Sequence, residues 1–110
     1  MKNDINKIQF NVFKGKLTRF RFANDSKRRI GMTARNLYIM LQCDITYKQF
    51  CMSIKESHLR IDTDYQFTDK NVLLSLSSVQ AILVMSNSEL SWQLHHALTD
   101  LIHNGFSDLN

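Results

Sequence analysis

Half of the positive charge of this chain lies in one short stretch near its N-terminus. Residues 14–29 have the sequence KGKLTRFRFANDSKRR and hold seven of the fourteen Lys and Arg residues, with Asp25 as their one acid. Guanidinium and ammonium groups are common ligands of nucleic-acid phosphates. The stretch therefore predicts a phosphate-binding surface, and a solvent-exposed hairpin without a ligand is the alternative. The residues expected to bind are Lys14, Lys16, Arg19, Arg21, Lys27, Arg28 and Arg29.

The charge is also unevenly divided along the chain. Residues 1–60 hold thirteen Lys and Arg against four acids, a net charge of +9. Residues 61–110 hold one Lys against six acids, a net charge of −5. Such polarity indicates that one face meets a polyanion and the other does not. Compositional drift without any partner is the competing interpretation.

Metal binding and catalysis are not expected. His95 and His96 are adjacent and point apart on a helix, and Cys43 and Cys51 are too far apart for a C-x-x-C motif. The chain has no Gly-rich phosphate loop, no G-x-S-x-G motif and no convincing carboxylate pair, so we expect neither an enzyme nor a cofactor. Both cysteines lie among apolar residues, as buried thiols do in a reducing compartment.

A length of 110 residues predicts a single domain. Apolar residues make up 44% and charged residues 22% of the sequence, which is ordinary for a soluble globular protein. No apolar run approaches the roughly 20 residues of a membrane span. The N-terminus lacks the apolar core of a signal peptide, so we expect a cytoplasmic protein.

Alternating apolar residues predict a β-hairpin at the N-terminus. Residues 8–13 and 17–22 both alternate with a period of two, and Gly15 between them suits a tight turn. The same period places the two phenylalanines of the second strand on an inner face. Leu17 and the two arginines of that strand are then expected on the outer face.

Short strands and four helices are expected after the polar loop at 23–29. The expected strands are 30–32, 65–67 and 71–76, with the last two as a hairpin. These elements predict an α+β fold in which small antiparallel β-hairpins pack with four helices, the first two forming a central helix-turn-helix-like pair. The expected helices are 34–42, capped by Thr33; 47–57, with a capping box of Thr46 and Gln49; 78–85, with Ser77 and Gln80; and 87–103, with Ser86 and Glu89.

The middle of the chain resembles a known family. Residues 32–54, MTARNLYIMLQCDITYKQFCMSI, are similar to the opening motif of phage antirepressor domains of the AntA/AntB type, which are related to KilA-N and Bro-N domains. The likeness extends over residues 30–103. We expect the whole chain, 1–110, to form one domain, in which 1–29 are an additional basic hairpin and loop and 104–110 are a tail. The matching residues are Ala34, Arg35, Asn36, Leu37, Tyr38, Leu41, Tyr47, Phe50 and Ile54.

The chain also departs from the pattern of that family. The second helix has Lys48 and Lys55 but lacks the usual dense basic cluster, and the last helix carries Glu89 and Asp100 in place of Arg and Lys. The basic hairpin near the N-terminus is expected to compensate for these missing cations.

The resemblance implies a regulator from a phage or mobile element, present in the cytoplasm of a bacterial host cell. We expect it to bind double-stranded DNA as a repressor, and as a homodimer because paired half-sites multiply the affinity of a small module. For Arg35 two roles are open: holding a carboxylate inside the domain, which we favour, and binding a phosphate. The further residues expected to contact DNA are Arg35, Thr46, Tyr47, Lys48, Gln49 and Lys55.

An antirepressor-type module that binds and inactivates a repressor or another host or phage protein is the alternative function. The acidic last helix favours it, and Trp92, Leu90 and Met85 are the residues expected at such an interface. Salt separates the two functions. Binding through about seven phosphates loses roughly three to four decades of affinity between 50 and 200 mM salt, whereas an apolar protein interface loses much less.

Overall fold

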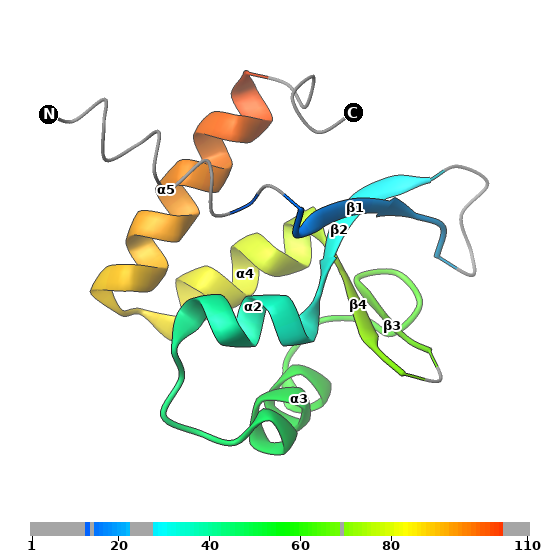
Figure 1. Ribbon diagram of the computed structural model, residues 1–110. Coiled ribbons are helices and arrows are strands. Elements are labelled where there is room, and N and C mark those ends of the chain that lie inside the picture. Colours follow the sequence, from blue (N-terminus) through cyan, green and yellow to red (C-terminus); the bar gives the residue numbers. More distant parts are fainter. Residues whose placement is uncertain (1–12, 14, 23–27, 69, 105–110) are drawn as a thin grey trace, which may run out of the picture.

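The computed structural model describes residue 13 and residues 15–22, 28–68 and 70–104 (Figure 1). The predicted α+β class is confirmed, since this part of the chain contains four helices and one four-stranded sheet. The strands are β1 (Leu17–Phe20), β2 (Arg29–Thr33), β3 (Tyr65–Phe67) and β4 (Val72–Ser75). The helices are α2 (Ala34–Leu41), α3 (Tyr47–Glu56), α4 (Leu76–Ser86) and α5 (Glu89–His103).

The four strands form an antiparallel sheet in the order β1–β2–β4–β3. The predicted hairpin of 65–67 with 71–76 is confirmed by the pairing of β3 with β4. Strand β1 pairs with β2 across the 21–28 connection, a pairing that was not predicted. Apart from Phe13, the expected partner strand 8–13 lies outside the described residues. The expected strand 30–32 lies within β2, which is one of the two inner strands of the sheet. Three residues are too few to show the alternation of apolar and polar side chains that identifies a strand from sequence.

One face of the sheet carries the core. Leu17, Met32, Leu74 and Tyr65 lie opposite one another across the four strands, and all four are buried. Helices α2 and α4 pack against this face. Leu17 was expected on the outer face but is only 5% exposed, so that expectation was wrong. The physical reason is the register, which places its side chain beside Met32 under the helices.

The two phenylalanines near the end of β1 form a separate cluster. The rings of Phe20 and Phe22 stack with centroids 5.5 Å apart, and Phe22 is fully buried while Phe20 is half-buried. The ring of Phe20 also lies over Gly31 of β2, where an added Cβ would come within 2.6 Å of Phe20 Cζ and would clash with the carbonyl oxygen of Leu74. Glycine is therefore required at position 31 for reasons of space.

Helices α2 and α3 begin where the sequence predicts. The Thr33 side chain accepts a hydrogen bond from the backbone N–H of Asn36, and the Thr46–Gln49 capping box is present. Helix α2 buries Leu37, Met40 and Leu41, which follow an i, i+3, i+4 spacing along one face. The two helices pack on each other, and residues 42–46 join them. Helix α3 presents Phe50 and Ile54 to the core.

The predicted caps of α4 and α5 were wrong. Ser75, not Ser77, caps α4 by accepting the N–H of Ser78, and α5 has a capping box of Ser88 and Ser91 instead of Ser86 and Glu89. The choice of Ser75 follows from tertiary contacts with the loop before β3. The backbone N–H of Ser75 and the hydroxyl of Ser78 both donate to the Asp64 carbonyl.

Helix α5 packs on α4, and in Figure 1 it lies on the opposite side of the molecule from the two β-hairpins. It ends at His103, whose position in the last turn suits the negative end of the helix dipole. No helix in the described part of the chain is long and apolar enough to cross a membrane.

Candidate nucleic-acid interface

The cations of the β1–β2 hairpin have different surroundings. Arg19, Arg21 and Arg28 are exposed, whereas Lys16 is half-buried and donates its backbone N–H to the carbonyl of Phe13. The hairpin thus carries its exposed cations along β1 and on both ends of the connection to β2. The predicted phosphate ligands Lys14 and Lys27 lie outside the described residues.

Arg29 takes part in packing. Its guanidinium carbon lies 4.3 Å from the centroid of the Phe22 ring, and its Nη2 donates a 2.7 Å hydrogen bond to the carbonyl of Thr63. These contacts join the aromatic cluster of β1 to the loop before β3. Removal of Arg29 therefore affects the fold as well as the charge, so a charge variant intended to test binding leaves Arg29 in place.

Two of the hairpin arginines also line an open cavity at the start of α4. The cavity has a volume of about 380 Å³, and its walls are Arg19, Arg29, Ile30, Ser75, Leu76 and Ser77. The first backbone N–H groups of a helix and its dipole both favour negative charge. The cavity thus combines two arginine side chains with the N-terminal end of α4.

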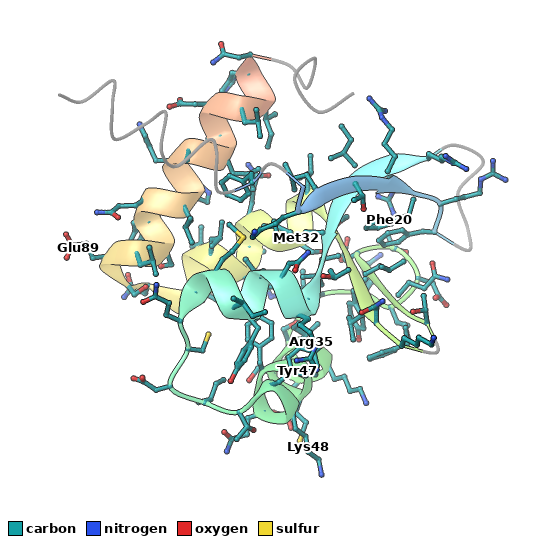
Figure 2. All side chains as sticks on the ribbon, viewed as in Figure 1. Phe20, Met32, Arg35, Tyr47, Lys48 and Glu89 are labelled. Carbon is teal, nitrogen blue, oxygen red and sulfur yellow. The ribbon has the colours of Figure 1, made fainter. Side chains whose placement is uncertain are left out.

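Arg35 stacks on an aromatic ring. Its guanidinium carbon lies 4.1 Å from the centroid of Tyr47, at the start of α3, and Tyr38 packs edge-on against the same ring. Among the described residues no carboxylate pairs with Arg35, so the expected structural role through a carboxylate is replaced by stacking. The arrangement leaves an exposed guanidinium at the α2–α3 junction (Figure 2).

The tyrosine beneath Arg35 stays protonated at all ordinary pH values. Burial, together with a contact to Cys51, raises the pKa of Tyr47 to about 12. Its hydroxyl is therefore a neutral donor. Tyr38 uses its own hydroxyl internally, donating a hydrogen bond to the carbonyl of Ile45 in the connection between α2 and α3.

Thr46 and Gln49 are engaged in the capping box. Gln49 Oε1 accepts the backbone N–H of Thr46 at 2.9 Å, and Thr46 Oγ1 accepts the N–H of Gln49 at 3.1 Å. Bidentate pairing with adenine uses both the oxygen and the amide nitrogen of Gln. Because its oxygen is occupied, Gln49 has chiefly its NH₂ group to offer to a base.

The outer face of α3 carries the two predicted lysines and a residue that was not predicted. Lys48, Met52 and Lys55 follow an i, i+4, i+7 spacing, and all are exposed, Met52 by 47%. They lie opposite the buried Phe50 and Ile54. The spacing of these three residues can be read from the sequence. Met52 was not predicted at the surface because a methionine in an amphipathic helix is usually a core residue.

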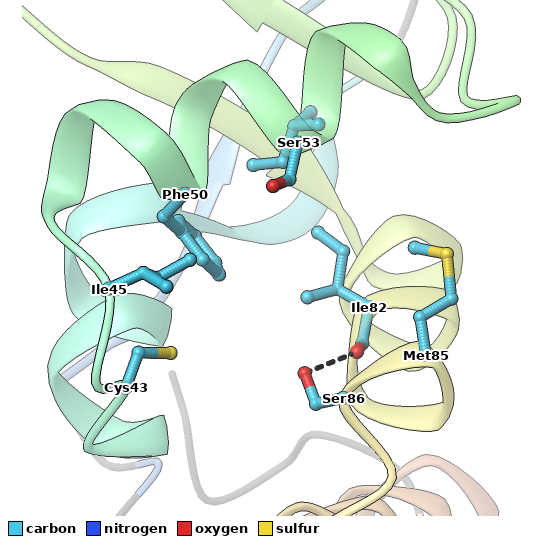
Figure 3. Close-up of a pocket in the computed structure, with 8 residues that line it drawn as sticks. Cys43, Ile45, Phe50, Ser53, Ile82, Met85 and Ser86 are labelled. Atoms are coloured by element: carbon cyan, nitrogen blue, oxygen red, sulfur yellow. Dashed lines mark hydrogen bonds between the residues drawn. The ribbon is translucent and has the colours of Figure 1, made fainter.

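An apolar groove lies between the inner side of α3 and the end of α4 (Figure 3). Its volume is about 300 Å³. Cys43 faces it, and burial, followed by the charge of Asp44, raises the pKa of this thiol above its ordinary value. The groove is lined by Cys43, Ile45, Phe50, Ser53, Ile54, Ile82, Met85 and Ser86.

Comparisons of the chain with protein-family models, with curated proteins and with solved structures gave no match. The likeness of residues 32–54 to antirepressor domains thus stays a prediction. Within the described residues, no three His, Cys, Asp or Glu side chains gather closely enough to hold a metal ion.

The residues predicted for a protein interface lie around the α4–α5 turn. Met85 and Trp92 are 50% and 46% exposed, whereas Leu90 is half-buried against the core. The indole N–H of Trp92 donates to Asn87 Oδ1, which fixes the ring on the turn. The acidic Glu89 lies here, at the left edge of Figure 2, apart from Arg35 near the centre and Lys48 at the bottom.

Proposed function

We propose that this protein is a DNA-binding regulator of transcription from a phage or mobile element, and that it acts as a repressor. The exposed cationic face of α3 carries the proposal. Lys48 and Lys55 project from this helix with Met52 between them, and neither lysine pairs with a described carboxylate. The likeness of the α2–α3 sequence to phage antirepressor domains supports the same class.

The dimensions of α3 suit the major groove. An α-helix with its side chains is about 10–12 Å wide, and the groove is about 12 Å wide. Helix α3 has ten residues and is therefore about 15 Å long, enough to cross several base steps. Its buried side is held by Phe50 and Ile54, so the lysine-bearing side is available to a duplex.

The hairpin cations provide the second part of the proposed surface. Arg21 and Arg28 are exposed, and Arg19, also exposed, lines the cavity at the start of α4. Arg and Lys contacts to phosphates give affinity without sequence information. We assign this role to the hairpin and the reading of bases to α3.

The test is fluorescence anisotropy with a labelled random duplex of about 30 bp, between about 50 and 200 mM salt. The variant is Arg21→Gln/Arg28→Gln, which removes two exposed charges and keeps Arg29 in its packing role. Each lost phosphate contact lowers the slope of log affinity against log salt by about 0.9, so the double variant should lose nearly two units of slope.

The matched control is Gln93→Glu/Asn104→Asp, which lowers the net charge by the same amount at exposed positions on and after α5. We expect this control to keep the wild-type slope. No binding of folded wild-type protein at the lowest salt contradicts the proposal, and equal slopes for both double variants remove the hairpin from the interface.

A second candidate function rests on the α4–α5 turn. Val84, Met85 and Trp92 are exposed apolar side chains there, and contiguous exposed apolar residues are typical of protein-binding surfaces. An antirepressor-type module would use this region to bind a repressor or another protein. Its binding to a protein partner should depend only weakly on salt, whereas binding to DNA should weaken steeply as salt rises.

A further inference from the structure

The β3–β4 hairpin ends beside the last turn of α3. The ammonium nitrogen of Lys55 lies 4.9 Å from the centroid of the Phe67 ring at the end of β3. Phe67 is 38% exposed, and its other neighbour is the buried Tyr65, whose ring packs edge-on at 5.6 Å. The aromatic pair thus connects the outer face of α3 to the hairpin.

The turn of this hairpin is held closed by a set of local hydrogen bonds. The backbone N–H of Thr68 donates to the Asn71 carbonyl at 2.8 Å, and the N–H of Asn71 donates to Thr68 Oγ1 at 3.0 Å. Thr68 Oγ1 in turn donates to the Asn71 carbonyl at 3.1 Å. Lys70 lies between these two residues and is exposed.

The position of the hairpin beside α3 determines what it can meet. A helix fills the width of the major groove almost completely. An element attached to the side of that helix, near its end, is therefore carried onto the sugar–phosphate backbone that borders the groove. Phosphate oxygens are the ligands that an ammonium group recognises there. No described carboxylate pairs with Lys70.

We propose that the β3–β4 turn is a second phosphate-binding arm, in which Lys70 contacts the DNA backbone beside the groove that α3 enters. The inference rests on the proposed DNA binding and extends it to an element in the acidic half of the sequence. Lys55, on the outer face of α3, is held over Phe67 and so joins that face to this hairpin.

The experiment compares Lys70→Gln with Gln93→Glu in the anisotropy titration. Both changes lower the net charge by one at exposed positions, but Gln93 lies on α5. We expect Lys70→Gln to reduce the salt slope by about one and to weaken binding equally for duplexes of unrelated sequence. Gln93→Glu should retain the wild-type slope, and Lys70→Arg should restore it.

Two results overturn the inference and can be told apart. If wild-type protein binds and Lys70→Gln keeps its slope, the turn does not contact phosphate while the proposed function stands. If folded wild-type protein does not bind the duplex at all, both proposals fail together. Thermal melts of the three variants establish that each is folded, which the exposure of Lys70 leads us to expect.

Discussion

At the scale of single residues, the thiol of Cys43 lies where burial and a neighbouring charge act in the same direction. Burial disfavours the thiolate, and the carboxylate of Asp44 repels it, so the pKa of Cys43 is raised. The thiolate is the species that reacts with alkylating agents. The native protein should therefore react more slowly at about pH 8 than the denatured protein, and its rate should keep rising at higher pH.

Asp44→Asn tests the electrostatic part of this shift. In a Cys51→Ala background, so that one thiol reports, iodoacetamide alkylation of Cys43 followed by mass spectrometry should be faster in Asp44→Asn at about pH 8, because the pKa of the thiol falls. Glu56→Gln removes one acid elsewhere and should leave the rate unchanged. Equal alkylation rates with and without the Asp44→Asn change, across the pH range, would show that burial alone raises the pKa.

Helix caps were predictable from the sequence only where neighbouring residues alone determine which side chain forms the cap. The Thr46–Gln49 box was found because one Thr stands three residues before one Gln in a break between apolar stripes. At the start of α4 the sequence offers several serines within a few positions. The Asp64 carbonyl decides among them by binding both Ser75 and Ser78, and this contact joins residues more than ten positions apart.

At the scale of elements, the centre of the sheet depends on Gly31. A Cβ at this position would meet the ring of Phe20 and the carbonyl oxygen of Leu74, and β2 is held between β1 and β4. We expect Gly31→Ala to lower the free energy of unfolding by about 2–3 kcal/mol, within the range of overpacked cores. The melting temperature should fall by roughly 10 °C or more.

Gly15→Ala is the matched control for that experiment. Gly15 has φ of +77°, and nothing lies within 4 Å of an added Cβ, so its substitution costs conformational strain without a clash. We expect a loss of about 1 kcal/mol, measured by urea unfolding beside Gly31→Ala. If both variants lose the same stability, the close approach of β1 and β4 to Gly31 is not tight in solution.

The existence and type of the elements were largely predictable, whereas strand pairing was not. Helix periods, the caps of α2 and α3, and the β3–β4 hairpin follow from neighbouring residues. The pairing of β1 with β2 does not follow from neighbouring residues. Gly15 suits a turn to the residues before β1, whereas a polar loop separates β1 from β2. Burial of Met32 in the middle of the sheet selects β2, and that information is tertiary.

At the scale of the whole molecule, part of the unequal charge of the sequence becomes a spatial separation. Arg19, Arg21 and Arg28 are exposed on the β1–β2 hairpin, whereas α5 carries Glu89 and Asp100 and no Lys or Arg. Figure 1 shows α5 on the other side of the molecule from this hairpin. The unequal distribution of charge can be read from the sequence, but the position of Lys70 in the fold cannot. The β3–β4 hairpin carries this lysine from the acidic half of the chain to the side of α3.

This division makes the single tryptophan a reporter that separates the two proposed functions. Trp92 is 46% exposed at the start of α5, and its indole is fixed to Asn87. If DNA binds along α3 and the hairpins, the emission maximum of Trp92 should not shift when a saturating amount of unlabelled duplex is added. Burial of the ring by a protein partner or a second copy should instead shift the emission to shorter wavelength, because the ring leaves water.

The measurement is an emission titration, first with DNA and then with increasing protein concentration alone. A shift that grows with protein concentration and is lost in Met85→Glu would assign the α4–α5 turn to a homodimer, with the DNA surface left open on the other side. A shift caused by DNA at fixed protein concentration would contradict this division of surfaces, since it would bring the acidic helix into the interface. Trp92→Phe, which keeps the packing on His95, supplies the tyrosine background for subtraction.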